Sequence, residues 1–128
     1  MSRPASKELT QRELEVMHVF WKKPEITAME AREVLSDRGV DRAYVTVANL
    51  VRVLGEKGFL EATNGQRPFK YRPTRSFEDV SGSLIRDLVQ RVFHGSREQL
   101  LVQMLGNKKK LSKAERELLS QVLKEQQS

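Results

Sequence analysis

The chain has 128 residues, of which 38% are hydrophobic and 31% charged, and its formal net charge at pH 7 is +6. This length fits one domain, or a small domain with an appendage, and the composition is neither that of a disordered chain nor that of a membrane protein. The sequence has no run of eighteen apolar residues, no apolar segment typical of a secretory signal, and no cysteine. We therefore expect a cytoplasmic protein without membrane insertion, disulfides or thiolate metal sites.

Sequence motifs of catalysis are missing. There is no P-loop, no dinucleotide-binding fingerprint and no nucleophile elbow. The two histidines, His18 and His94, are far apart and neither begins a metal-ligand pair. We expect no enzyme activity, no cofactor and no metal site.

The first predicted helix covers residues 11–22. It follows a polar segment, residues 1–8, that we expect to fray. Thr10 and Glu13 have the spacing of a capping box, in which the threonine hydroxyl and the glutamate carboxylate each accept from the other residue's amide. A broad apolar side predicts burial of Leu14, Met17, Val19, Phe20 and Trp21.

A second capping box, Thr27 and Glu30, opens a helix over residues 28–37 that ends before Gly39. A third helix starts at Asp41 or Ala43. Its apolar stripe is Val47, Leu50, Val51 and Leu54. Its opposite face holds Arg42, Val45, Asn49, Arg52 and Glu56, with Thr46 at the flank.

Two short alternating runs, residues 59–63 and 69–73, follow the helix stop at Gly58. Asn64-Gly65 between them predicts a hairpin turn with positive φ angles. A helix-turn-helix followed by a basic hairpin is typical of a winged helix, in which the second helix enters a major groove and the hairpin lies along the backbone.

Positive charge is concentrated in this segment. Between residues 42 and 75 there are seven cations and two acids, so the net charge is 7 − 2 = +5. Clustered cations of this kind are typical of a phosphate-binding surface. The alternative is an ordinary solvated face on a basic protein.

Three further amphipathic helices are predicted after Pro73: one from Phe77, one over residues 97–105 and a last one opened by Ser112 and Glu115. A further capping box, Ser96 and Gln99, opens the middle one. The lysine run at 108–110 is either a solubilising loop or a nucleic-acid contact.

Fifty residues make a poor independent core, so these helices need another surface. We expect a two-fold homodimer; the alternative is packing on the winged helix of the same chain. The dimerisation candidates are Leu84, Ile85, Leu88, Val89, Val92, Phe93, Leu100, Leu101, Met104, Leu118, Leu119 and Val122. The expected fold is mainly α with a small β-hairpin: a winged helix-turn-helix domain at 1–75 and a helical dimerisation region at 76–128.

Three segments together resemble the penicillinase-repressor family, the BlaI/MecI/CopY group of bacterial transcription regulators. They are LTQRELEVMHVFWK, AYVTVANLVRVLGEKGFL and GQRPFKYRP, followed by a break at FHGS. The resemblance covers nearly the whole chain. It implies a dimeric repressor of double-stranded DNA operators with a TACA…TGTA-like dyad.

The resemblance also implies the DNA-facing positions Arg42, Tyr44, Val45, Thr46, Asn49 and Arg52, with Gln66, Arg67 and Lys70 on the wing. By their chemistry, Asn49 could pair with adenine, Arg52 with guanine or phosphate, and Val45 with a thymine methyl. Tyr44 is either a structural anchor or a phosphate contact, and Thr46 either caps the helix, packs against it or contacts a phosphate. Asn49 stands where the family often has threonine, a departure that leaves the operator sequence of this chain open.

Two regulatory branches of the family bear on this chain. The copper-responsive branch binds metal through a C-terminal cysteine pair, which this sequence lacks. Antibiotic-resistance members are cut at an Asn–Phe bond under a membrane-bound sensor metalloprotease; the corresponding bond here is Gln103–Met104. Relief of repression by cleavage at that bond is a hypothesis. The competing function is a winged-helix protein-interaction module without sequence-specific DNA binding.

Overall fold

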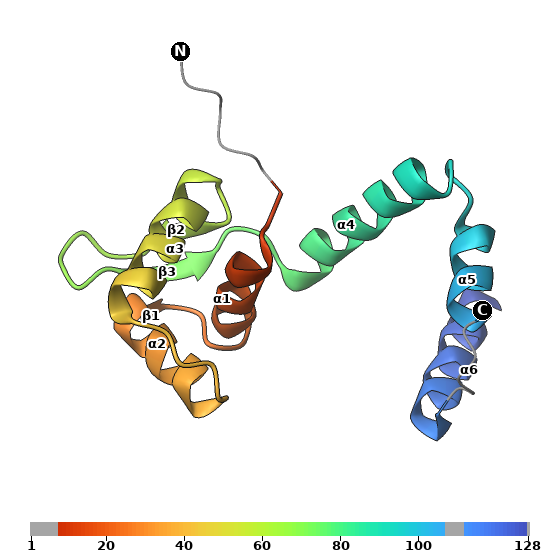
Figure 1. Ribbon diagram of the computed structural model, residues 1–128, viewed down its shortest axis with the longest axis horizontal. Coiled ribbons are helices and arrows are strands. Elements are labelled where there is room, and N and C mark those ends of the chain that lie inside the picture. Colours follow the sequence, from red (N-terminus) through yellow and green to blue (C-terminus); the bar gives the residue numbers. More distant parts are fainter. Residues whose placement is uncertain (1–7, 107–111, 128) are drawn as a thin grey trace, which may run out of the picture. The chain divides into compact units, whose positions relative to one another are not determined.

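The computed structural model describes residues 8–106 and 112–127 (Figure 1). The predictions made for residues 1–7 and for the lysine run at 108–110 lie outside the described residues. Contacts divide the chain into two compact units, the first ending at Gly82 and the second beginning at Ser83. The elements in chain order are α1 (Gln11–Lys22), β1 (Ile26–Thr27), α2 (Ala28–Asp37), α3 (Tyr44–Glu56), β2 (Leu60–Ala62), β3 (Lys70–Pro73), α4 (Phe77–Val92), α5 (Arg97–Leu105) and α6 (Lys113–Gln127).

Most helix starts follow the predicted capping chemistry. Both reciprocal hydrogen bonds form at the starts of α1, α2 and α6, where Thr10, Thr27 and Ser112 are the capping hydroxyls. At α5 only half of the predicted box forms: the Gln99 amide donates to Ser96 Oγ at 3.1 Å. The Ser96 amide instead donates to the carbonyl of Phe93, so it does not need the Gln99 side chain.

A three-stranded antiparallel sheet, in the order β1-β3-β2, completes the winged helix. Ile26 pairs with Tyr71 and Leu60 pairs with Pro73. The predicted fold class is confirmed, but β1 was not predicted. This strand has only two residues, and its partner is more than forty residues away.

The loop between β2 and β3 extends beyond the helices of its unit (Figure 1), and its turn was predicted wrongly. Among the described residues, positive φ angles occur at Glu25, His94 and three glycines, and neither Asn64 nor Gly65 is one of them. The Asn64 side chain closes the loop instead. Its Oδ1 accepts from the Lys70 amide at 2.8 Å, and its Nδ2 donates to the Pro68 carbonyl at 3.2 Å.

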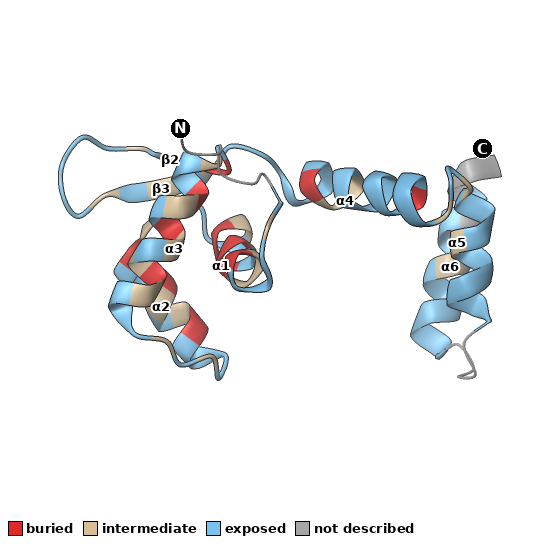
Figure 2. Ribbon diagram, turned by 45° about the horizontal axis from the view of Figure 1, so that its top comes forward, coloured by how far each residue is buried: buried red, intermediate tan, exposed pale blue. Residues whose placement is uncertain are grey.

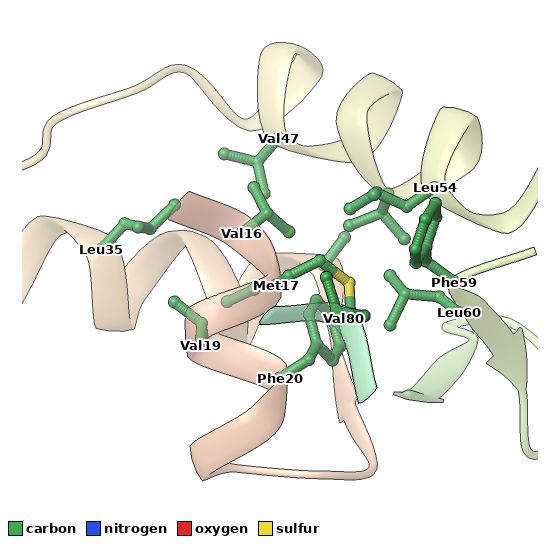
Figure 3. Packing of buried hydrophobic residues seen from close by; sticks show 13 residues of the cluster. Val16, Met17, Val19, Phe20, Leu35, Val47, Leu54, Phe59, Leu60 and Val80 are labelled. Carbon is green, nitrogen blue, oxygen red and sulfur yellow. The ribbon is translucent and has the colours of Figure 1, made fainter. Parts of the chain in front are cut away.

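The core of the first unit forms around α1 (Figure 3). Met17, Val19 and Phe20 are completely buried, as the apolar periodicity predicts, whereas Leu14 is only half-buried. They pack with Leu35 of α2, with Val47, Val51 and Leu54 of α3, with Phe59 and Leu60, and with Val80 from the start of α4. Packing into this core fixes the position of α3 and leaves the opposite face of the helix exposed.

One charged pair lies at the edge of that core. Lys57 Nζ is 2.8 Å from Glu13 Oε1, and the two side chains are only 7% and 5% exposed. Lys57 also donates to the Glu8 carbonyl, and the Thr10 amide donates to Glu13. Burial by itself raises the pKa of Glu13, but the hydrogen bonds from Lys57 and Thr10, with the Lys57 charge, bring that pKa below its ordinary value.

The second unit has a different burial pattern (Figure 2). α5 has no buried residue, and the described side chains of α6 are exposed or half-buried. Large apolar side chains are exposed on all three helices, among them Leu84, Ile85, Leu88, Val92, Leu101, Met104, Leu118 and Val122. Phe93, Leu100 and Leu119 are half-buried. Val89 differs, because the single chain already leaves it only 6% exposed.

Candidate nucleic-acid interface

The outward face of α3 carries polar and small apolar side chains. Val45 is 76% exposed, Tyr44 and Asn49 are exposed, and Thr46 is half-buried. The helix begins after Ala43, which makes no side-chain capping bond. The predicted recognition positions on this helix therefore lie on a solvent-accessible face above the buried Val47 and Val51.

The side chains of Asn49, Arg52 and Glu56 form a chain of contacts along α3. Arg52 Nη2 donates to Asn49 Oδ1 at 2.8 Å. Arg52 Nη1 also forms an ion pair with Glu56, four residues further on. Arg52 is thus held between an amide oxygen and a carboxylate, and both its side chain and that of Glu56 remain more than half exposed.

Arg42 has a different environment from the other predicted DNA-facing residues. Its guanidinium lies 3.0 Å from Glu15 of α1, and both side chains are largely covered. Its carbonyl accepts from Arg32 Nε of α2 at 3.0 Å. Arg42 therefore connects the segment before α3 to both preceding helices, a structural role that was not predicted from the sequence.

The wing presents Gln66, Arg67 and Lys70, all exposed. The Arg67 guanidinium lies 6.0 Å from the centre of the Phe69 ring, a distance suited to a cation–π contact. An open groove of about 550 Å³ separates the wing from α3 and the start of α2; its lining includes Tyr44, Arg52 and Arg67. The groove brings together predicted residues that are more than twenty positions apart in the sequence.

The charge count needs a correction. Lys57 was predicted to belong to the cationic cluster, but its side chain is buried against Glu13. Arg42 is likewise paired with an acid of α1, and Arg72 pairs with Glu61. Two of the five net charges are thus balanced by α1. The cations of the segment that form no ion pair within the described residues are Arg67, Lys70 and Arg75.

The predicted cleavage position lies in the second unit. Gln103 and Met104 are in the last turn of α5, and Met104 is 61% exposed.

No group of three or more acidic or histidine side chains among the described residues could hold a metal ion. No helix within residues 8–106 and 112–127 has both the length and the apolar character needed to cross a bilayer.

In the first unit α2 and α3 form a helix-turn-helix, a three-stranded sheet carries the wing, and α3 has an exposed polar face. These features define the class of winged-helix DNA-binding proteins. Residues 9–125 match the family model described as penicillinase repressor, and the chain belongs to that family. It is accordingly a DNA-binding transcriptional repressor, which points to a regulator rather than an enzyme.

Comparison with individual proteins gives one further observation. The chain is similar to the monomeric form of Bacillus licheniformis BlaI, whose solution structure was solved in complex with the blaP half-operator. The identity is 29%, the match covers 62% of this chain and 93% of that one, and the TM-score is 0.47. No curated protein matches the chain.

Proposed function

We propose that this chain represses transcription as a homodimer that binds a pseudo-palindromic promoter operator and blocks access of polymerase. Residues 1–75 would bind DNA in the cytoplasm and residues 76–128 would hold the two subunits together. The observation that carries the proposal is the pairing of an accessible α3 face with a cationic wing on a rigid core, in a member of a repressor family.

Each half-site would receive one α3 and one wing. Val45, Asn49 and Arg52 are suited to base edges, because they project from α3 and are exposed. Gln66, Arg67 and Lys70 are suited to phosphates, because they are exposed on the wing and two of them are cations. Tyr44 and Thr46 lie at the edge of the same face. Arg42 would position α3 through its contacts with Glu15 of α1 and Arg32 of α2.

The dimer is supported by the exposed apolar side chains of α4, α5 and α6. A monomer rarely exposes so many large apolar residues on adjacent helices without a partner. A second copy of the chain provides a matching surface, and two-fold symmetry then matches an operator dyad. The proposed contact uses the exposed and half-buried candidates; Val89 is already covered within one chain.

The decisive experiment is binding of the purified protein to its own upstream promoter, titrated against salt with random DNA as competitor. We expect a footprint over a dyad and a preference of about a thousandfold or more over random DNA. Sedimentation of the same sample should show a dimer. Equal, weak binding to both DNAs by a dimeric sample would contradict operator recognition and favour a protein-interaction module.

Relief of repression by proteolysis is proposed at Gln103–Met104. Cleavage there would separate α6 from α4 and most of α5, and so weaken the dimer. Co-expression with the cognate membrane-bound sensor protease and its inducer should yield fragments that end at Gln103. Induction of the target gene while the chain stays intact would exclude this route.

A further inference from the structure

The contact between Asn49 and Arg52 restricts which base edge α3 can recognise. Arginine is always protonated and has only donors, so the atom of Asn49 that faces it must be the amide oxygen. The 2.8 Å distance from Arg52 Nη2 to Asn49 Oδ1 satisfies this requirement. The donor group of Asn49, Nδ2, is consequently the one left for a ligand.

A bidentate contact to adenine needs both ends of the amide at one base edge, the oxygen for N6 and the nitrogen for N7. In this chain Arg52 already uses one of the two lone pairs of that oxygen. Asn49 thus has a free donor in Nδ2, whereas an adenine contact would have to share Oδ1 with the guanidinium of Arg52, which disfavours the contact expected from residue type alone.

Glu56 fixes the other end of Arg52 through their ion pair. Arginine has five N–H donors, and Asn49 and Glu56 engage two of them. The remaining donors of Arg52 and Nδ2 of Asn49 belong to two exposed side chains of α3 that are in direct contact. The free hydrogen-bonding groups of this pair are therefore mostly donors, and the one remaining acceptor position, on Asn49 Oδ1, lies next to a positive charge.

We infer that Asn49 and Arg52 act as one donor-rich unit that reads a guanine, whose N7 and O6 are adjacent acceptors in the major groove. Adenine offers N7 beside an amino donor, which this unit would oppose. The inference rests on the proposed function and specifies the operator chemistry of the same site. It makes Glu56 a positioning residue that holds Arg52 in place.

The test has two steps. First, the wild-type dimer selects preferred sites from a library of randomised half-sites. Second, Asn49→Ala, Arg52→Ala and the double variant are titrated with the selected site and with each of its single-base changes. Arg116→Ala and Gln121→Ala, which remove the same kinds of side chain from α6, serve as matched controls, and circular dichroism checks the fold of every variant.

A coupled unit predicts that each single variant loses about 10–100-fold in affinity and flattens preference at one and the same guanine. The double variant should lose little more than the weaker-binding single variant, because each substitution already disrupts the unit. The α6 controls should keep the base preference.

Two outcomes would contradict the inference in different ways. If the losses multiply, and Asn49→Ala flattens an adenine position that Arg52→Ala leaves intact, the two residues read bases independently and only the pairing fails. If the wild type enriches no sequence at all, operator recognition itself fails, and the proposed function fails with it.

Discussion

The two units of this chain treat apolar side chains in opposite ways. In the first, Met17, Phe20, Val47 and Leu54 are buried inside one cluster drawn from four helices and the sheet. In the second, α5 has no buried residue and leaves Leu101 and Met104 exposed. The amphipathic patterns of the two units are similar in sequence, so periodicity predicts that a face will be covered but not whether the cover comes from the same chain.

The largest expected effect is in the first unit. Phe20→Ala should lower the free energy of unfolding by about 3–5 kcal/mol, since it leaves a cavity in a closed core. Urea denaturation measures it. Leu118→Ala, at a 62% exposed position, should change the stability of the dilute monomer by less than about 0.5 kcal/mol and matter only at concentrations where the dimer forms. A large loss in the dilute monomer would show that α6 is covered by its own chain.

The buried charge pair gives the next effect. Glu13→Gln leaves Lys57 buried without its counter-charge and should cost about 3 kcal/mol at neutral pH. Because folding lowers the pKa of Glu13 below 4.5, its contribution is present above that value and is lost as the pH falls through the folded-state pKa. The variant should therefore approach the wild type in stability on acidification. A constant difference in denaturation midpoint between pH 7 and pH 3 would contradict this assignment.

The dimer contact is tested by Leu88→Glu. A carboxylate placed on the exposed apolar side of α4 should weaken self-association about 100-fold or more, equivalent to about 2.7 kcal/mol. Gln90→Glu adds the same charge at another exposed position of α4 and is the control. Sedimentation across a concentration series distinguishes them, and an intact Leu88→Glu dimer would remove α4 from the interface.

The smallest effect is expected on the wing. Arg67→Ala should weaken binding to operator and random DNA alike, and reduce the slope of log affinity against log salt by about one, while leaving dimerisation unchanged. Arg116→Ala removes the same charge from α6 and should leave the slope as it is. An unaltered slope for Arg67→Ala would take this residue off the phosphate backbone.

Much of the fold followed from local chemistry. Thr10 and Thr27 start helices with their own hydroxyls, and Gly39, Gly58 and Gly95 adopt the positive φ angles that end helices or follow them. These signals act over a few residues and are visible in the sequence. By contrast, β1 exists only through pairing with β3, and the wing turn depends on side-chain bonds of Asn64 rather than on its backbone angles.

The candidate site was predictable in position but not in charge. The apolar stripe of α3 already indicates that Val45, Asn49 and Arg52 point outward. Counting charges along the chain could not show that Lys57 and Arg42 have acidic partners on α1, because those contacts span 44 and 27 residues. Non-local ion pairs of this kind depend on the packing of α1 against α3.

Trp21 gives this protein a built-in optical reporter. It is the single tryptophan of the chain, its indole Nε1 donates to the Arg75 carbonyl at 2.9 Å, and its ring meets that of Phe77 edge-on at 5.3 Å. It therefore reports on the short segment where the wing passes into α4. Any event that rearranges this segment should shift the intrinsic emission, so it can be followed in real time without a label.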